Sequence, residues 1–313
     1  MVLENCLVCD SAESNLLYGS AKDYVTDERF SVRQCASCGL VFTAPSPQVT
    51  NHYYPSTYRR YGGASMALLK WLYLRRARSW LRTFSGPGFA LEVGCGNGWM
   101  LRAIKQRGWT VTGTERNFES AAYAKSASEI PMFVGGLEAL QAKPTFDLIF
   151  LFQVLEHLPD PLGTLKQCAS LLKPNGRLII SVPNFESWQS QLFGPSWFHL
   201  DVPRHLTHFS AASLRDIALL ADLTIMKIGF VSFEHDPYGW VQSGLNWLGF
   251  RQNQLTWLLM GMDPQQRLTP PAVGMLAVGA LLAVPAFLLT LWSWWCNAGA
   301  VMEVWCMRTE APD

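Results

Sequence analysis

Between Phe89 and Ser232 the chain alternates short apolar runs with stretches in which apolar residues recur every three or four positions. The first pattern is typical of buried strands and the second of amphipathic helices. Strands are predicted at 89–94, 109–114, 131–134, 146–151, 176–182 and 223–231, and helices at 98–107, 118–128, 161–172 and 211–221. This alternation predicts an α/β fold with a parallel, doubly wound sheet.

The first predicted strand leads directly into a glycine-rich turn. The stretch reads Leu91-Glu-Val-Gly-Cys-Gly-Asn-Gly98, and a helical pattern starts at Trp99. Glycine lets the backbone turn tightly and approach a ligand without a Cβ clash, and a helix start offers free N–H groups. Strand, glycine turn and helix in this order suit a nucleotide-type cofactor, and a tight turn without a ligand is the alternative.

Acidic residues mark the first two predicted strands. Glu115 ends the second strand, where a carboxylate can accept both hydroxyls of a ribose, although a solvated acid would fit there too. Glu92 lies inside the first strand, where an unpaired acid is costly, and a ligand amino group is a suitable partner. A third turn, after the strand at 146–151, carries Gln153, Glu156 and His157.

Several motifs follow one another in a characteristic order. They are Leu91-Glu-Val-Gly-Cys-Gly-Asn-Gly98, Glu115, Phe146-Asp-Leu, Val154-Leu-Glu-His-Leu158 and Leu172-Lys-Pro-Asn-Gly176. Over roughly residues 85–232 the chain thereby resembles the class I S-adenosylmethionine-dependent methyltransferases. The stretch from Asp201 to Ser210 is similar to one subgroup, whose members often carry an N-terminal Cys-x-x-Cys module and act on sugars, lipids or other small molecules.

The resemblance implies a seven-stranded Rossmann-like sheet and a binding site for S-adenosylmethionine. Gly94, Gly96 and Gly98 would shape the pocket for methionine and ribose. Glu92 would lie near the methionine amino group, and Glu115 would bind the ribose hydroxyls.

The remaining cofactor contacts are expected after the third and fourth strands. The resemblance implies that Leu137 and Glu138 flank adenine and that Gln153 lines the cofactor near its methyl group. We interpret Glu156 and His157 as local structure rather than as catalysts.

Three histidines cluster between the fifth strand and the next helix. They are His199, His205 and His208, with Asp201 among them. Histidine titrates near neutrality, so we predict that His205 or His208 acts as general base or acceptor ligand. Such a base is needed only if the acceptor must lose a proton. The alternative is that these residues hold the loop together and that Ser210 caps the following helix.

Two Cys-x-x-Cys pairs lie near the N-terminus. Cys6 and Cys9 are separated from Cys35 and Cys38 by 25 residues. Four thiolates on two knuckles suit a tetrahedral, structural Zn²⁺, while a redox dithiol or free thiols are the alternatives. The first ten residues lack the pattern of a secretory signal, which favours a cytoplasmic location and metal binding over disulfides.

Charge is unevenly distributed along the chain. The net charge of +1 argues against bulk polyanion binding, yet nine Arg and Lys and no acids lie between Arg29 and Leu91. A basic helix is predicted over Met66–Phe84, either packed on the core with a solvated face or docked on anionic lipid. Nucleic acid is not an expected partner.

A long apolar segment precedes the C-terminus. The 35 residues from Leu268 to Met302 carry no charge, and Ala272–Trp292 is long enough to span a membrane. The resemblance implies that Val301–Met307 is an antiparallel seventh strand, so the chain must return to its starting side. We therefore favour a hairpin broken near Pro285 that dips into one leaflet. A full span and a buried oligomer or lid surface are the alternatives.

Five segments are thus expected. They are a zinc-ribbon-like module at 1–46, a linker and basic helix at 47–85, a methyltransferase core at 86–232, an apolar helical insertion at 233–299 and a final strand and tail at 300–313. The expected activity is methyl transfer to a small-molecule, glycan or lipid-linked acceptor, with membrane association through residues 268–298. Methylation of a soluble nucleotide sugar and a non-catalytic membrane scaffold are the alternatives.

Overall fold

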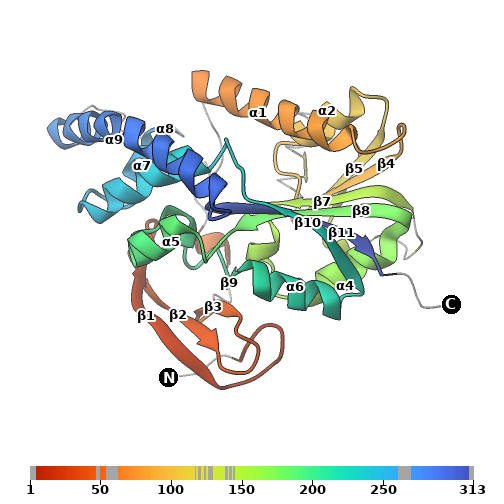
Figure 1. Cartoon of the computed structure of the whole chain (residues 1–313), viewed down its shortest axis with the longest axis horizontal. Helices are drawn as coiled ribbons and strands as arrows, with labels where there is room; N and C mark the ends of the chain where they lie inside the picture. Colours follow the sequence, from red (N-terminus) through yellow and green to blue (C-terminus); the bar gives the residue numbers. More distant parts are fainter. Residues whose placement is uncertain are drawn as a thin grey trace. The chain divides into compact units, whose positions relative to one another are not determined.

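The computed structural model of the chain is drawn in Figure 1. It describes residues 5–46, 50–53, 63–116, 118, 121–122, 125, 130–137, 140, 143, 145–259 and 269–309. The chain forms two compact units from segments that are distant in sequence. Unit 1 comprises Met1–Leu68, Pro183–Ser213 and Phe230–Met302, and unit 2 comprises Leu69–Val182, Leu214–Gly229 and Glu303–Asp313. This division cuts across the five segments expected from the sequence.

Unit 2 is built on a seven-stranded sheet in the order β10-β11-β8-β7-β4-β5-β6. The strands are β4 Phe89–Val93, β5 Thr110–Glu115, β6 Met132–Val134, β7 Phe146–Phe152, β8 Leu172–Pro183, β10 Leu223–Gly229 and β11 Val301–Arg308. From β8 to β6 neighbouring strands are parallel, whereas β11 is antiparallel to β10. The predicted seven-stranded sheet and its late antiparallel strand are therefore confirmed.

Helices cover both faces of this sheet. They are α1 Gly63–Leu81, α2 Trp99–Lys105, α4 Pro161–Leu171 and α6 Ala211–Leu220, and the short 3-10 helix η3 spans Leu155–His157. Figure 1 shows α1 and α2 over one face and α4 and α6 over the other. Most of the helix predicted at 118–128 lies outside the described residues.

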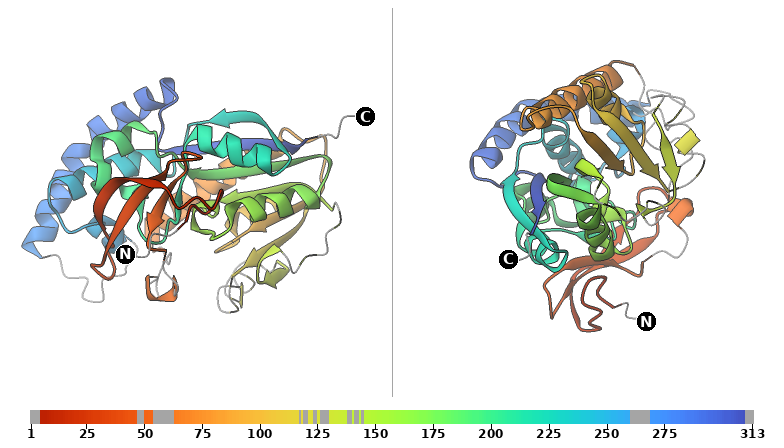
Figure 2. Two further views of the ribbon diagram at one scale, coloured as in Figure 1. Left: turned by 90° about the horizontal axis from the view of Figure 1, so that it is seen from below. Right: turned by 90° about the vertical axis from the view of Figure 1, so that its right-hand side faces the viewer.

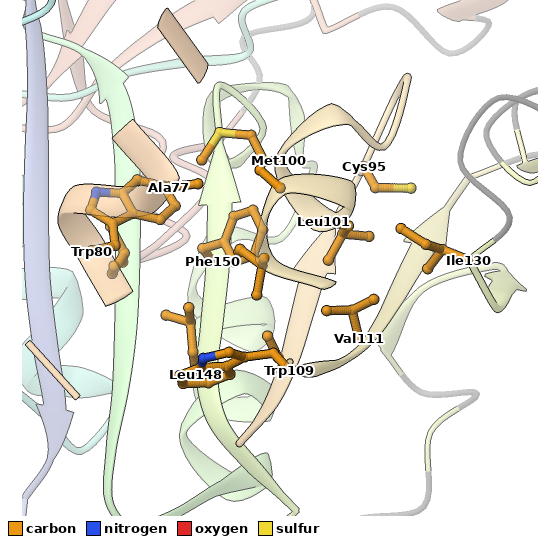
Figure 3. Packing of buried hydrophobic residues seen from close by; sticks show 14 residues of the cluster. Ala77, Trp80, Cys95, Met100, Leu101, Trp109, Val111, Ile130, Leu148 and Phe150 are labelled. Carbon is orange, nitrogen blue, oxygen red and sulfur yellow. The ribbon is translucent and has the colours of Figure 1, made fainter. Parts of the chain in front are cut away.

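The basic helix α1 is anchored in the core of unit 2. Ala77 and Trp80 are buried against β7, where the Trp80 and Phe150 ring centroids are 5.4 Å apart (Figure 3). Arg76 forms an ion pair with Glu303, whose carboxylate also accepts the Trp80 indole N–H. One face of this helix therefore packs on the sheet, in agreement with the first of the two predicted alternatives.

Unit 1 contains a second, four-stranded sheet in the order β1-β2-β3-β9, antiparallel throughout. Its strands are β1 Ser14–Lys22, β2 Arg29–Cys35, β3 Val41–Ala44 and β9 Thr207–His208. Val41 pairs with His208, and Phe42 pairs with Thr207. The cysteine-rich N-terminus therefore shares a sheet with a segment more than 160 residues later in the chain.

The helices of unit 1 come largely from its C-terminal part. They are α5 Trp188–Phe193, α7 Asp236–Trp247, α8 Gln254–Leu259 and α9 Pro270–Trp295, and the 3-10 helices are η1 Thr50–Tyr53, η4 Gly194–Ser196 and η5 Phe198–Leu200. Figure 2 shows α7 and α9 from two further sides. The apolar insertion is helical, as predicted.

The predicted break at Pro285 is wrong, because α9 is one helix of 26 residues with this proline inside it. An interior proline removes one backbone hydrogen bond and crowds the preceding turn. Here α7 packs on α9 at both sides of the proline. The Trp294 indole donates to Asp236 at the start of α7, and a Cβ on Gly279 would lie 3.7 Å from Leu245 Cδ1 near its end. α9 thus stays continuous through Pro285 with α7 packed against it on both sides.

Candidate active site

The glycine loop of unit 2 follows β4 without an intervening residue. Gly94, Gly96 and Gly98 have φ angles of 67°, 53° and 62°, in the left-handed region that favours glycine. A Cβ on Gly94 would lie 2.9 Å from Val154 Cγ2, so a larger residue does not fit. No described heavy atom lies within 4 Å of the position that a Cβ on Gly96 would take, so the backbone is open to a ligand there.

Glu115 ends β5 and reaches across to this loop. Its carboxylate accepts the backbone N–H of Gly96 and, at 3.3 Å, the backbone N–H of Arg116. The side chain is half-buried, so part of the carboxylate remains open to a ligand. The strand-end acid and the glycine loop therefore meet, as the sequence pattern predicts.

Glu92 lies beneath the loop and is 5% exposed. Its Oε2 has no hydrogen-bond partner among the described residues. Burial, and secondarily the Glu115 carboxylate, raise the pKa of Glu92 well above its usual value, against a hydrogen bond from the Leu101 backbone. A cationic group placed beside Glu92 would restore its charge. This orphaned acid fits the ammonium group expected at that position.

The other predicted cofactor contacts lie at the ends of β6 and β7. Leu137 is buried soon after β6, and Glu138 lies outside the described residues. Gln153 directly follows β7 with a φ of 56°, and its backbone N–H donates to the Ser181 carbonyl at 2.8 Å. Its side-chain amide donates to Ser181 Oγ at 3.3 Å. Gln153 is thus held at the carboxyl end of the parallel strands, where ligands bind in such sheets.

The histidine loop, which we define as residues 197–208, lies in unit 1 and follows β8 and α5 in the chain. Arg204 and Asp23 form an ion pair at 2.8 Å with both side chains fully buried, and Arg204 also pairs with Asp201 at 2.7 Å. The Arg204 guanidinium stacks 4.1 Å from the Tyr24 ring centroid. The N-terminal module therefore holds this loop through a buried charge network.

His208 is buried within the four-stranded sheet. Its Nε2 is 2.9 Å from the hydroxyl of Thr43. Burial, and secondarily the positive charge of His205, lower the pKa of His208 to about 3. His208 is therefore neutral at physiological pH, and its imidazole has little basicity left for proton abstraction. The prediction of His208 as a general base does not fit this environment.

His205 is held differently. Its Nδ1 is 2.8 Å from the backbone carbonyl of His199, which can only accept, so Nδ1 carries the proton in the neutral ring. The other nitrogen, Nε2, then has the lone pair and lies 3.8 Å from Asp201 Oδ2. Ser210 accepts the backbone N–H of Ser213 and so caps α6, as the alternative interpretation of this loop expects.

A family model described as a methyltransferase domain matches residues 62–228, which is more than half of the 313 residues. The chain belongs to the class I S-adenosylmethionine-dependent methyltransferases. The resemblance inferred from the motifs between Leu91 and Gly176 is thereby confirmed.

Individual relatives match only part of this chain, and the chain spans less than two thirds of the curated relatives that it matches. The ubiquinone biosynthesis O-methyltransferase of Salmonella enteritidis is 32% identical over 148 residues, which cover 44% of this chain and 61% of that protein. A solved S-adenosylmethionine-dependent methyltransferase from Archaeoglobus fulgidus is 19% identical, with a TM-score of 0.48 over 76% of this chain and 93% of its own. Magnesium protoporphyrin IX methyltransferase from Synechocystis, solved with bound S-adenosylhomocysteine, is also 19% identical. Its TM-score is 0.44, and the match covers 54% of this chain and 80% of that protein.

The four predicted metal ligands of the chain come together in unit 1. Their Sγ atoms all lie within 4.8 Å of one another, in Cys6, Cys9, Cys35 and Cys38. Burial raises the pKa of Cys35, but N–H donors from the backbone of Cys38 and Ser37 prevail and hold it at about 6. A thiolate therefore forms readily in a set of four sulfur donors, which is the donor set that tetrahedral Zn²⁺ prefers.

Sequence reasoning missed the residues that tie the histidine loop to the N-terminus. Thr43 and Asp23 are fully buried polar residues in segments without a recognisable motif. Their partners, His205, His208 and Arg204, lie more than 160 residues away, so no local pattern pairs them.

Proposed function

We propose that this methyltransferase transfers the methyl group of S-adenosylmethionine to a small-molecule, glycan or lipid-linked acceptor. The observation that carries the proposal is the position of two acids at the glycine loop. Glu115 accepts the N–H of Gly96, and Glu92 is buried with its Oε2 unpartnered among the described residues. S-adenosylmethionine supplies a methyl group that the sulfonium already activates, so the protein mainly has to align the acceptor with it. Glu92 would hold the ammonium group of the donor and Glu115 its ribose hydroxyls.

We assign the role of general base to His205. With Nδ1 bound to the His199 carbonyl, Nε2 can accept the proton of an acceptor hydroxyl as its oxygen attacks the methyl carbon. The C–O bond forms, the C–S bond breaks, and the proton remains on Nε2. The Asp201 carboxylate at 3.8 Å favours the resulting imidazolium. The similar Salmonella protein is an O-methyltransferase, which favours a hydroxyl acceptor.

The test uses purified protein, methyl-labelled S-adenosylmethionine and separate extracts of soluble metabolites, glycans and lipids. We expect label in at least one of these extracts, and the labelled extract identifies the class of acceptor. Label in soluble nucleotide sugars would support the alternative substrate class. Binding of S-adenosylmethionine with no label in any extract would favour a non-catalytic scaffold and overturn the proposal.

The assigned base is tested by His205→Gln. Turnover should fall at least about 100-fold while the affinity for S-adenosylmethionine stays unchanged. His208→Gln is the matched control, since glutamine can keep the bond to Thr43, and it should retain most of the activity. Unchanged turnover in His205→Gln would remove His205 from the mechanism.

We further propose that the four cysteines bind a structural Zn²⁺. Four protein ligands would fill a tetrahedral shell and leave no position for a substrate. Elemental analysis of the purified protein should find one zinc per chain, and Cys9→Ser combined with Cys38→Ser should abolish it. Full occupancy in the double variant would contradict the assignment.

We also propose that α9 attaches the protein to one leaflet of a membrane. Of the helices in the described part of the chain, only Pro270–Trp295 has the length and apolar character of a membrane span, with a mean hydropathy of 2.4 and 22% of its most apolar window buried. Small and polar residues such as Gly279, Ala286 and Ser293 form its buried stripe. Charged residues are absent from the whole helix.

The opposite side of α9 is a continuous apolar stripe. Leu281, Val284, Leu288, Trp292 and Trp295 follow at helical spacing and are 61–87% exposed. Exposed apolar surface of this kind marks interaction sites, and tryptophan favours the boundary between hydrocarbon and water. A lipid surface suits a face that has no charge and no hydrogen-bonding group except the indole N–H.

Chain connectivity favours attachment over a span. α7 begins seven positions after β10 ends, and β11 begins six positions after α9 ends. Because β10 and β11 pair in one sheet, the chain must leave and return on the same side of a membrane. α7 has 12 residues, too few to cross beside α9, since a span needs about 20.

Vesicle flotation tests the attachment. The wild type should float with phosphatidylcholine vesicles, and Leu281→Asp combined with Leu288→Asp should remain in the soluble fraction. Leu219→Asp is the matched control, because Leu219 is 72% exposed on α6, outside the proposed surface. Equal flotation of the wild type and the double variant would overturn the proposal.

A further inference from the structure

One buried side chain, Thr43, joins the four-cysteine module to the histidine loop. Thr43 lies in β3 and is fully buried. Its hydroxyl donates to the His205 carbonyl at 2.7 Å and lies 2.9 Å from His208 Nε2. Its backbone N–H donates to the Leu206 carbonyl at 3.0 Å. Thr43 therefore contacts three of the four residues from His205 to His208.

The hydroxyl of Thr43 determines the protonation of His208. A hydroxyl has a single proton, and Thr43 uses it on the His205 carbonyl, which can only accept. Thr43 Oγ1 must therefore act as acceptor toward His208, and His208 Nε2 must carry its proton. The same hydroxyl thus holds the backbone of His205 and selects one tautomer of His208.

The path from the cysteines to Thr43 is short and well connected. Cys35 ends β2, and its backbone N–H donates to the Leu40 carbonyl directly before β3. The knuckle between them turns at Gly39, which has a φ of 73° and donates its N–H to the Cys35 carbonyl. β3 then pairs with β2 on one side and with β9 on the other. Only β3 and these hydrogen bonds therefore separate Thr43 from the knuckle.

We infer that Thr43 is a positioning residue and that the four-cysteine module keeps the histidine loop in its working conformation. Loss of the metal would loosen β3, release the Thr43 hydroxyl from both histidines and disable the proposed base. The glycine loop belongs to unit 2 and takes no part in this network, so donor binding should persist. The catalytic consequence rests on the proposed role of His205, whereas the positioning itself does not.

The experiment follows the histidine ring nitrogens by ¹⁵N NMR, with Thr43→Val as the main variant. Valine keeps the shape of threonine and removes only the hydroxyl. The His208 signals should change from a single Nε2–H tautomer to a mixture, and the His205 signals should shift. Thr43→Ser keeps the hydroxyl and should restore the wild-type spectrum.

Thr207→Val is the matched control for loss of a buried hydroxyl in the same sheet. Thr207 is 1% exposed, and its Oγ1 has no hydrogen-bond partner among the described residues. This variant should leave both histidine spectra unchanged. If Thr43→Val fails to fold, Thr43→Ala gives the same readout, because it also removes the hydroxyl.

Removal of the metal by a chelator tests, without any substitution, whether the four-cysteine module holds the histidine loop in its conformation. The chelated protein should show the Thr43→Val histidine spectrum and keep its affinity for S-adenosylmethionine within about twofold. Once an acceptor is known, kcat of Thr43→Val should be about 10–100-fold lower, because a small displacement of a catalytic group has effects of this size.

Two results would overturn the inference. One is an unchanged histidine spectrum in Thr43→Val, and the other is an unchanged spectrum after the metal has been removed. Neither result depends on methyl transfer. A failure of the proposed activity, by contrast, would appear as missing turnover in the wild type while the spectra respond as expected.

Discussion

The glycine loop and the histidine loop are built in opposite ways. Residues 92–98 and Glu115 come from two consecutive strands that pair side by side, so a local stretch of chain supplies the whole arrangement. The histidine loop takes its partners from Asp23 and Thr43, which lie more than 160 residues earlier. In the first site the buried Glu92 has one carboxylate oxygen, Oε2, without a hydrogen-bond partner among the described residues, whereas in the second Arg204 pairs with Asp23 and Asp201.

This difference separates two ways to shape a functional loop. A glycine loop needs backbone freedom and leaves polar groups open for a ligand. The histidine loop instead needs specific partners at its ring nitrogens: the His199 carbonyl fixes the tautomer of His205, and the Thr43 hydroxyl fixes that of His208. The glycine loop is thus formed by a local stretch of chain that leaves polar groups available. The histidine loop is held by hydrogen bonds and ion pairs from distant segments.

The strongest test of the buried Arg204 network is Arg204→Met. It would leave the Asp23 and Asp201 carboxylates without their buried counter-charge. We expect the free energy of unfolding to fall by about 3–5 kcal/mol in urea denaturation. Asp23→Asn added to this variant should recover part of the loss. A loss below about 1 kcal/mol would mean that the network does not stabilise the loop.

Acid should destabilise the protein through His208. Its pKa is about 3 in the folded state and 6.5 when unperturbed, so the unfolded chain binds the proton first. The stability is fully present above pH 6.5 and decreases as the pH falls toward 3, by about 1.4 kcal/mol for each pH unit.

His208→Gln is the control for this pH dependence. It removes the titrating group and should flatten the decrease between pH 6 and pH 4 in denaturation curves. His199, whose pKa burial also lowers, still titrates in that variant, so a shallower slope remains. An identical slope in both proteins would show that His208 is not held neutral.

The open site is tested by Glu115→Ala, measured by calorimetry with S-adenosylmethionine. Loss of hydrogen bonds from a charged acceptor costs about 1.5–3 kcal/mol, so the affinity should fall about 10–150-fold. Unfolding of unit 1 should not change. Glu115→Asp should keep part of the affinity, and an unaffected Kd in Glu115→Ala would exclude the ribose contact.

The smallest effect is expected for Lys173→Met in unit 2. Lys173 pairs with Asp147 at 2.8 Å, and about a third of each side chain is exposed. Such pairs contribute about 0–1 kcal/mol, so the free energy of unfolding should change by less than that amount. A loss of stability as large as that of Arg204→Met would mean that the partly exposed Lys173–Asp147 pair stabilises the protein as much as the buried Arg204 network does.

Much of unit 2 could be predicted from the sequence. The strand that carries Glu92, the left-handed glycines and the strand-end acid Glu115 follow from periodicity and local turn chemistry. Val301–Arg308 was predictable as a strand, and its place beside β10 followed from family resemblance. These features depend on neighbours in the chain or on one regular sheet.

Pro285 illustrates where such reasoning fails. Proline predicts a break because of its own stereochemistry. The continuous α9 reflects the packing of α7 on both sides of that residue, which a local pattern does not contain. The same limit applies to His205 and His208, whose spacing suggested equivalent roles until Thr43 and the His199 carbonyl distinguished them.

The amino-acid sequence by itself determined the fold class, the glycine loop with its two acids and the two cysteine pairs. Each depends on residue type and spacing along a short stretch of chain. Only the tertiary structure decided that the cysteine module shares a sheet with the histidine loop, that His208 is neutral and that α9 runs through its proline. Those outcomes arise from contacts between distant segments, where burial and hydrogen bonding, rather than local preference, set the free energy.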